Sequence, residues 1–275
     1  MVAMTDEGSS SSKEVVFSNA SDYHHTSGIQ FKQGRRLAML LRCTLPEDFA
    51  PRYIADLGCG SGRYTELVAG LFPDARLVAA DCSPAMLALA EQVLKGERYS
   101  FVECDLETAD LGSLLGTEKY DLVTSNAVLH WIHDHRRLYC EIHRILTPGG
   151  WVAIHQGGKG CYRELVELAE SLLRESGLWG KYFEGFVNPI KYITGEELAD
   201  IVEAAGFRIA DLHMVLSHVY PETLAADFAQ SALLPYSHRI EDTAEREAFE
   251  RRFISRARMV DRVTINRLYF IGQKP

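Results

Sequence analysis

The segment Asp56-Leu57-Gly58-Cys59-Gly60-Ser61-Gly62 decides the fold of this chain. An apolar run at residues 53–55 leads into it, and helical spacing follows over residues 63–72, which predicts a short buried strand, a loop and a helix. Glycines permit positive φ and let a ligand approach the main chain closely. The start of the helix offers unpaired N–H groups to a carboxylate or a phosphate. The segment therefore predicts a ligand-binding loop at the end of a strand.

The spacing of the glycines narrows the choice of ligand. Gly58, Gly60 and Gly62 form the pattern G-x-G-x-G, whereas the dinucleotide fingerprint is G-x-G-x-x-G. Arg63 occupies the place of the third fingerprint glycine, which serves close packing of helix on strand. No G-x-x-x-x-G-K-[ST] pattern is present, so a P-loop is excluded. An NAD-dependent oxidoreductase is therefore disfavoured.

Strands and helices alternate beyond this loop. We expect strands at residues 76–80, 99–102, 121–125 and 151–155, with helices between them. Ser83 can cap the helix that follows the second strand, and Pro84 suits its first position. Such alternation predicts parallel pairing with right-handed crossovers, and helices on both faces of an open sheet. Ligands of such sheets bind beyond the carboxyl ends of the strands.

Polar residues stand at three of these strand ends, namely Asp81, Asp105 and Asn126. An acid about 20 residues beyond a glycine loop commonly accepts hydrogen bonds from ribose hydroxyls, in NAD sites and others alike. Asp81 could instead be the N-cap of the next helix, but Ser83 is available for that purpose. Asp105 could be an acid in a surface turn. We favour ligand binding for both, because of their positions.

With these landmarks, the chain resembles the class I methyltransferases that depend on S-adenosylmethionine (SAM). Residues 56–62 resemble motif I, and the acids at Asp81 and Asp105 and the run Leu-Thr-Pro-Gly-Gly at 146–150 follow in the family's order. Residues 269–272 resemble the family's last strand, which is antiparallel. The resemblance covers about residues 30–157. It implies an α/β, Rossmann-like doubly wound fold: a mostly parallel seven-stranded sheet with an antiparallel last strand, plus a helical lid.

The resemblance also assigns roles in binding SAM, with S-adenosylhomocysteine as the product. The glycine loop would hold the methionine part, and Asp56 would orient its amino group, directly or through water. Asp81 would hold the ribose, and Asp105 and Leu106 the adenine. Asn126 would lie near the transferring methyl. The complete set of expected cofactor-binding residues is Asp56, Gly58, Cys59, Gly60, Gly62, Asp81, Cys82, Asp105, Leu106, Asn126 and Tyr23, the last as a lid residue.

The expected organisation has five parts. A disordered tail at 1–14 precedes an N-terminal helical lid segment at 15–45. The SAM-binding core spans 46–158. A helical substrate lid spans 159–260 and includes a core helix and strand near 194–216, where Thr194-Gly195-Glu196-Glu197 reads as a capping box. The final core strand lies within 261–275.

Further segments point to the reaction. Residues 23–25, 128–134 (VLHWIHD) and 186–194 resemble the subgroup that contains trans-aconitate, malonyl-carrier-protein and juvenile hormone acid methyltransferases, which esterify carboxylates. A carboxylate is already a nucleophile at pH 7 and needs positioning more than a base. We therefore expect carboxylate O-methylation of a small molecule by direct in-line transfer. Two alternatives stay open: C- or N-methylation, or other chemistry, on a natural-product intermediate, and SAM binding without catalysis.

Candidate substrate residues are His130, Trp131, His155 and Arg239. His130 would contact the substrate or act as a base, and an arginine such as Arg239 would clamp a carboxylate. The competing interpretation places His130 and Trp131 in a loop packed on the sheet, with Trp131 against the cofactor, and leaves Arg239 solvated. The histidines match no metal-ligand template, so we expect no metal.

Composition limits the partners. The formal net charge of −9 disfavours nucleic acid. No apolar run approaches the roughly 20 residues that span a bilayer, and residues 1–15 contain no apolar signal core, so we expect a cytoplasmic protein. The six scattered cysteines are expected to be reduced. We expect a small-molecule substrate, free or attached to a carrier protein, and leave monomer and homodimer open.

Overall fold

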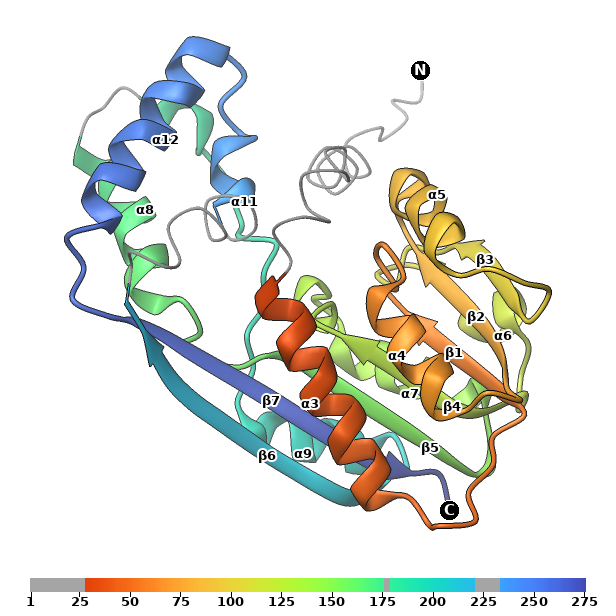
Figure 1. Cartoon of the computed structure of the whole chain (residues 1–275). Coiled ribbons are helices and arrows are strands. Elements are labelled where there is room, and N and C mark those ends of the chain that lie inside the picture. Colours follow the sequence, from red (N-terminus) through yellow and green to blue (C-terminus); the bar gives the residue numbers. More distant parts are fainter. Residues whose placement is uncertain (1–27, 176–178, 221–232) are drawn as a thin grey trace, which may run out of the picture.

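A seven-stranded sheet forms the centre of the molecule in the computed structural model, which describes residues 28–175, 179–220 and 233–275. The strand order is β3-β2-β1-β4-β5-β7-β6 (Figure 1). β7 runs antiparallel to both of its neighbours, and the other pairs are parallel. The predicted Rossmann-like sheet with an antiparallel last strand is confirmed. The strands are β1 (Tyr53–Leu57), β2 (Arg76–Asp81), β3 (Tyr99–Glu103), β4 (Tyr120–Asn126), β5 (Leu146–Gly157), β6 (Arg208–Val219) and β7 (Val263–Gln273).

Helices cover both faces of this sheet. One face packs against α3 (Gly28–Thr44), α4 (Arg63–Leu71) and α5 (Pro84–Val93). The other face packs against α6 (Leu111–Leu115), α7 (His135–Ile145) and α9 (Gly195–Ala204). The short 3-10 helix η1 (Leu129–Trp131) follows β4 and lies against β5. The two apolar faces give the sheet two separate cores, as expected for a strand layer buried on both sides.

Local sequence signals set several helix ends as predicted. The Ser83 hydroxyl accepts a hydrogen bond from the Met86 N–H at 3.3 Å, and Pro84 begins α5. Thr194 and Glu197 form the predicted capping box at the start of α9. Each cap satisfies N–H groups that the first helical turn leaves unpaired.

A second group of helices lies beyond one end of the long strands β6 and β7 (Figure 1). It contains α8 (Arg163–Glu175), η2 (Gly180–Tyr182), α11 (Leu234–Ser237) and α12 (Thr243–Ala257). Its own apolar core includes Leu172, Trp179, Phe249 and Phe253. This group occupies the region predicted as the substrate lid, and we call it the helical cap.

Two strand boundaries were predicted wrongly. β5 begins at Leu146, ahead of the Pro-Gly-Gly turn, because the Gly149 N–H donates to the Lys274 carbonyl and the Lys274 N–H donates to Gly150. β6 continues beyond its expected limit near residue 216, to Val219, because β7 pairs with it over that length. The predicted tail at 1–14, residues 15–27 of the N-terminal lid segment and Tyr23 lie outside the described residues. No helix in the described part of the chain is long and apolar enough to cross a membrane.

Candidate active site

The glycine loop turns sharply at the end of β1. Gly58, Gly60 and Gly62 have φ values of 76°, 53° and 81°, a region that L-residues rarely adopt. The Gly58 and Cys59 N–H groups both donate to the Ala80 carbonyl, at 2.7 and 3.0 Å, which ties the loop to β2. A Cβ at Gly58 would lie 2.4 Å from a Val128 methyl, so this position cannot take a larger residue without movement. A Cβ at Gly60 would meet only open space.

Asp81 braces this loop from the end of β2. One carboxylate oxygen accepts the Gly60 N–H at 2.8 Å and the other accepts the Ser83 N–H at 3.0 Å. Burial raises the pKa of Asp81, and these backbone N–H groups oppose the rise. The N-cap of α5 is Ser83 and not Asp81. The Asp81 carboxylate instead holds the glycine loop through Gly60.

Asp56 lies beneath the loop and is 1% exposed. One of its oxygens accepts the Thr65 hydroxyl at 2.5 Å, and the other oxygen has no hydrogen-bond partner. Burial raises the pKa of Asp56 from 3.8 to about 7, against the effect of the Thr65 hydrogen bond. The site therefore contains a carboxyl group that is half neutral near pH 7 and has one oxygen to offer.

These elements enclose a cavity of about 1040 Å³, counted with the solvent at its open mouth. It lies at the carboxyl ends of the strands, where ligands of such sheets bind. The lining residues are Phe31, Gly58, Cys59, Gly60, Ser61, Tyr64, Asp81, Cys82, Met86, Cys104, Asp105, Leu106, Asn126, Ala127, Val128, Trp131 and Ile132. Eight of the predicted cofactor residues, together with Trp131, are brought into this one cavity. Asp56, which is buried, and Gly62, the last residue of the loop, do not line the cavity.

Helix α3 closes the cavity on one side. A Cβ at Gly34 would lie 2.8 Å from the Tyr64 ring and 3.1 Å from the Asn126 amide nitrogen, so glycine lets α3 approach this closely. Phe31 reaches the cavity one turn earlier, and the Arg63 guanidinium lies 4.4 Å from its ring centroid. Sequence reasoning missed Phe31, although its apolar side chain within an expected helix was the available signal.

The predicted histidines lie behind the cavity wall. His155 is fully buried, and its Nδ1 is 2.8 Å from the Asn126 side-chain oxygen. The His130 Nδ1 accepts the Gly157 N–H at 3.3 Å, and its ring stacks on Tyr192 at 5.7 Å. Burial lowers the pKa of His130 to about 3 and that of His155 well below its usual value. Neither ring lines the cavity, and the Tyr269 ring packs against His155 with its centroid 4.8 Å away. The predicted substrate contact of His155 stays a prediction.

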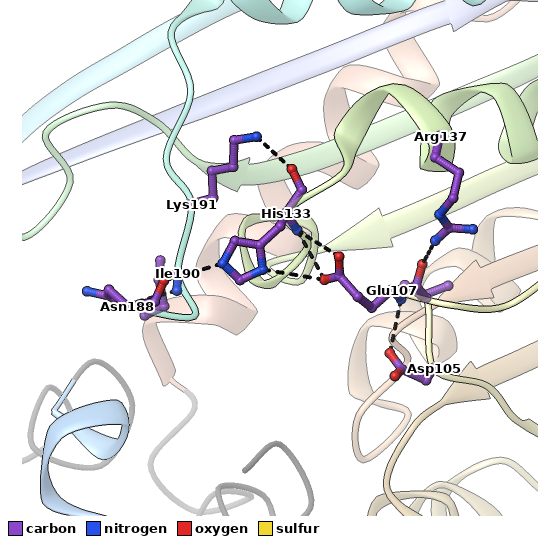
Figure 2. A network of polar contacts seen from close by, with 8 residues as sticks. Asp105, Glu107, His133, Arg137, Asn188, Ile190 and Lys191 are labelled. Carbon is purple, nitrogen blue, oxygen red and sulfur yellow. Dashed lines mark hydrogen bonds and ion pairs between the residues drawn. The ribbon is translucent and has the colours of Figure 1, made fainter. Parts of the chain in front are cut away.

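A polar network joins the cavity to the segment that leads to the helical cap (Figure 2). The Asp105 carboxylate accepts the Glu107 N–H at 3.0 Å, and Glu107 in turn accepts the His133 N–H at 3.1 Å. The Lys191 ammonium donates to the His133 carbonyl at 2.6 Å, and a His133 ring nitrogen lies 3.4 Å from the Asn188 carbonyl. The loop that contains Asp105 is therefore tied to residues 188–191.

Arg239 is not part of this wall. It lies in the helical cap, is exposed, and donates from Nε to the Tyr182 carbonyl at 3.0 Å. The structure thus brings it together with the cap and not with the cavity. Within the described ranges, no three histidine, cysteine or acidic side chains gather as a metal site would need.

Comparison with known proteins shows what this chain is similar to. Residues 55–154 match the family model described as a methyltransferase domain. A trans-aconitate 2-methyltransferase of Acidovorax sp. (strain JS42) is 31% identical over 176 residues, which cover 64% of this chain and 65% of the relative. The match thus spans just under two thirds of that relative's length.

Two solved structures share the fold. Phosphoethanolamine N-methyltransferase 2 of Haemonchus contortus, in complex with S-adenosylhomocysteine, has a TM-score of 0.57 and 17% identity, covering 95% of this chain and 60% of that one. The [4+2]-cyclase SpnF has a TM-score of 0.55 and 20% identity, covering 87% and 81%. The predicted resemblance to methyltransferases is confirmed, and the structures show that one fold serves more than one chemistry.

Proposed function

We propose that the methyltransferase domain at residues 55–154 binds SAM and that the chain methylates a carboxylate of a small acceptor. The observation that supports this most is the convergence of the glycine loop with Asp81, Asp105 and Asn126 in one cavity. They come from the ends of four different strands, and the family resemblance gives each a separate part of SAM. The relative named for trans-aconitate supports the choice of a carboxylate.

The residues present fit SAM. The unpartnered, buried oxygen of Asp56 lies beneath the loop, where an ammonium group or a bridging water would satisfy it. Gly60 leaves open space above the loop for the methionine part. Met86, Leu106 and Ile132 supply apolar surface for a planar base. Bound there, SAM would supply a methyl group on a sulfonium for in-line displacement.

The acceptor side of the cavity favours a nucleophile that is already ionised. His130 and His155 are neutral at pH 7, weakly basic and behind the wall, so neither is placed to remove a proton. A carboxylate needs no proton removal, and its reaction is accelerated by positioning and by exclusion of water. Asn126 and Trp131 line the cavity and would orient the carboxylate.

The test combines binding with the chemistry of the product. Isothermal titration with S-adenosylhomocysteine should show a single site, and no binding at high micromolar concentration would end the proposal. SAM with a tritiated methyl group is then incubated with a panel of carboxylic acids. Mild alkali should release the label as volatile methanol, because esters hydrolyse. Label that resists alkali would indicate C- or N-methylation, and binding without turnover would indicate a non-catalytic protein.

A further inference from the structure

Arg267 of β7 is a buried cation that has no anionic partner among the residues that the structure describes. The residue is only 6% exposed. One terminal nitrogen donates to the Tyr162 hydroxyl at 2.8 Å, and the guanidinium lies 5.2 Å from that ring's centroid. Its Nε has no hydrogen-bond partner, and no carboxylate of the described residues forms an ion pair with it.

Such an arrangement is costly unless a ligand completes it. A buried charge costs several kcal/mol unless it is paired and hydrogen-bonded. A phenol and an aromatic face compensate part of this cost, but they carry no opposite charge. A guanidinium with donors left over matches a carboxylate, which can accept two of them at once.

The strand register places Arg267 on the same face of the sheet as the cavity wall. Asn126 pairs with His155 across β4 and β5, and His155 pairs with Tyr269 across β5 and β7. Arg267 stands two residues from Tyr269, opposite Gly157, so its side chain shares that face. The Nε2 atom of His155, between Asn126 and Arg267, is buried and unpartnered as well.

A row of aromatic rings at η1 leads from the cavity toward Gly157, which pairs with Arg267. Trp131 lines the cavity, and the His130 ring lies 6.1 Å from it and 5.7 Å from the Tyr192 ring. Tyr192 covers Gly157, where a Cβ would lie 2.4 Å from its ring. Burial lowers the pKa of His130 and raises that of Tyr192; the positive charge of Arg267 adds to the first shift and opposes the second.

We propose that Arg267 is a substrate-binding residue that holds a carboxylate of the acceptor other than the one that is methylated. This rests on the proposed function. The separation follows from the register, because two strand spacings, from β4 across β5 to β7, and two residues along β7 put its Cα about 12 Å from that of Asn126. A guanidinium held against the methylated carboxylate would also neutralise the charge that makes it a nucleophile. The preferred acceptor therefore has at least two acid groups.

The test measures binding without turnover. Propane-1,2,3-tricarboxylate and butyrate are titrated into the full-length protein saturated with S-adenosylhomocysteine, in wild type, Arg267→Met and the exposed control Arg252→Met. The wild type and the control should bind the triacid more tightly than butyrate. Arg267→Met should bind S-adenosylhomocysteine normally but lose about 30-fold or more in affinity for the triacid, as expected when a buried charge partner is removed.

Thermal unfolding separates this role from a structural one. Arg267→Met should unfold no lower than the wild type, because it removes an uncompensated buried charge, whereas a structural role predicts a clear loss. Should that variant not fold, Arg267→Gln, which can still donate to Tyr162, replaces it. Equal triacid affinity in wild type and variant, or no triacid binding to a wild type that binds S-adenosylhomocysteine, overturns the inference alone. Failure of S-adenosylhomocysteine to bind overturns the proposed function, and the inference with it.

Discussion

Replacing Asp56 with asparagine should remove a specific pH dependence of stability. The folded protein holds this carboxyl beneath the glycine loop, where burial raises its pKa from 3.8 to about 7. In the unfolded chain its pKa is ordinary. Between these two values the folded state keeps the proton and the unfolded state releases it, so rising pH favours unfolding. The stabilising effect of the neutral carboxyl is complete below pH 3.8 and is lost as pH rises through 7.

The size of the effect follows from the two pKa values. Between pH 5 and pH 7 the unfolding free energy should fall by about 1.36 kcal/mol per pH unit, and it should level off above pH 7. The total between pH 5 and pH 8 is about 2.7 kcal/mol. No discount for solvent screening applies, because Asp56 is 1% exposed. An asparagine cannot ionise, but its side-chain oxygen can still accept the Thr65 hydroxyl.

Urea unfolding at pH 5, 6, 7 and 8 measures this difference. The other titrating groups are common to both proteins, so the gap between wild type and Asp56→Asn isolates the one carboxyl. We expect the variant to gain about 2.7 kcal/mol relative to the wild type over this range. Thr65→Val serves as a control that removes the hydroxyl but keeps the titration. Parallel pH profiles for wild type and Asp56→Asn would show that Asp56 is ionised in the folded protein and would refute the reasoning.

Three further outcomes are expected. In urea unfolding, Gly58→Ala should lower the unfolding free energy by about 1–3 kcal/mol more than Gly60→Ala. An alanine at either position is strained by the positive φ, but only the Cβ at position 58 would also overlap Val128. Equal losses in the two variants would contradict this. His130→Asn should keep methyl transfer to a carboxylate within about tenfold of the wild-type rate, whereas loss of a general base costs about 10²–10⁴-fold; steady-state rates between pH 5.5 and 8 decide between them. Thr194→Ala should lower the unfolding free energy by about 1 kcal/mol through loss of the capping box, with S-adenosylhomocysteine affinity unchanged by titration calorimetry; a matching loss of affinity would show that α9 acts on the site.

Short-range patterns predicted the part of the site that is built from neighbouring residues. The glycine loop, the Ser83 cap and the capping box at Thr194 depend on residues within a few positions of each other. Strand ends could be located from the change of hydrophobic period, and parallel alternation places those ends along one edge. Asp81, Asp105 and Asn126 therefore meet in one cavity as expected.

Contacts between distant segments could not be predicted in the same way. His155 is buried against the ring of Tyr269, its partner on β7. The register of that pairing cannot be predicted from the sequence of either strand alone. Arg267 meets Tyr162 because the first part of β7 packs against the helical cap, which brings residues from two separate segments together. The sequence could place Arg239 in the cap region but could not predict its hydrogen-bond partner, which is the Tyr182 carbonyl.

The position of β7 between β5 and β6 affects how this chain can be made. Ribosomes deliver residues in order, so β5 and β6 both emerge before the strand that separates them in the finished sheet. Until residues 263–273 arrive, each of the two strands presents an open edge to other nascent chains. During this interval, apolar side chains such as those of Ile154 and Phe207 lack their packing partner Phe270. Of the seven strands, the one that separates β5 from β6 is therefore the last to be made, and aggregation can compete with completion of the sheet until it is inserted.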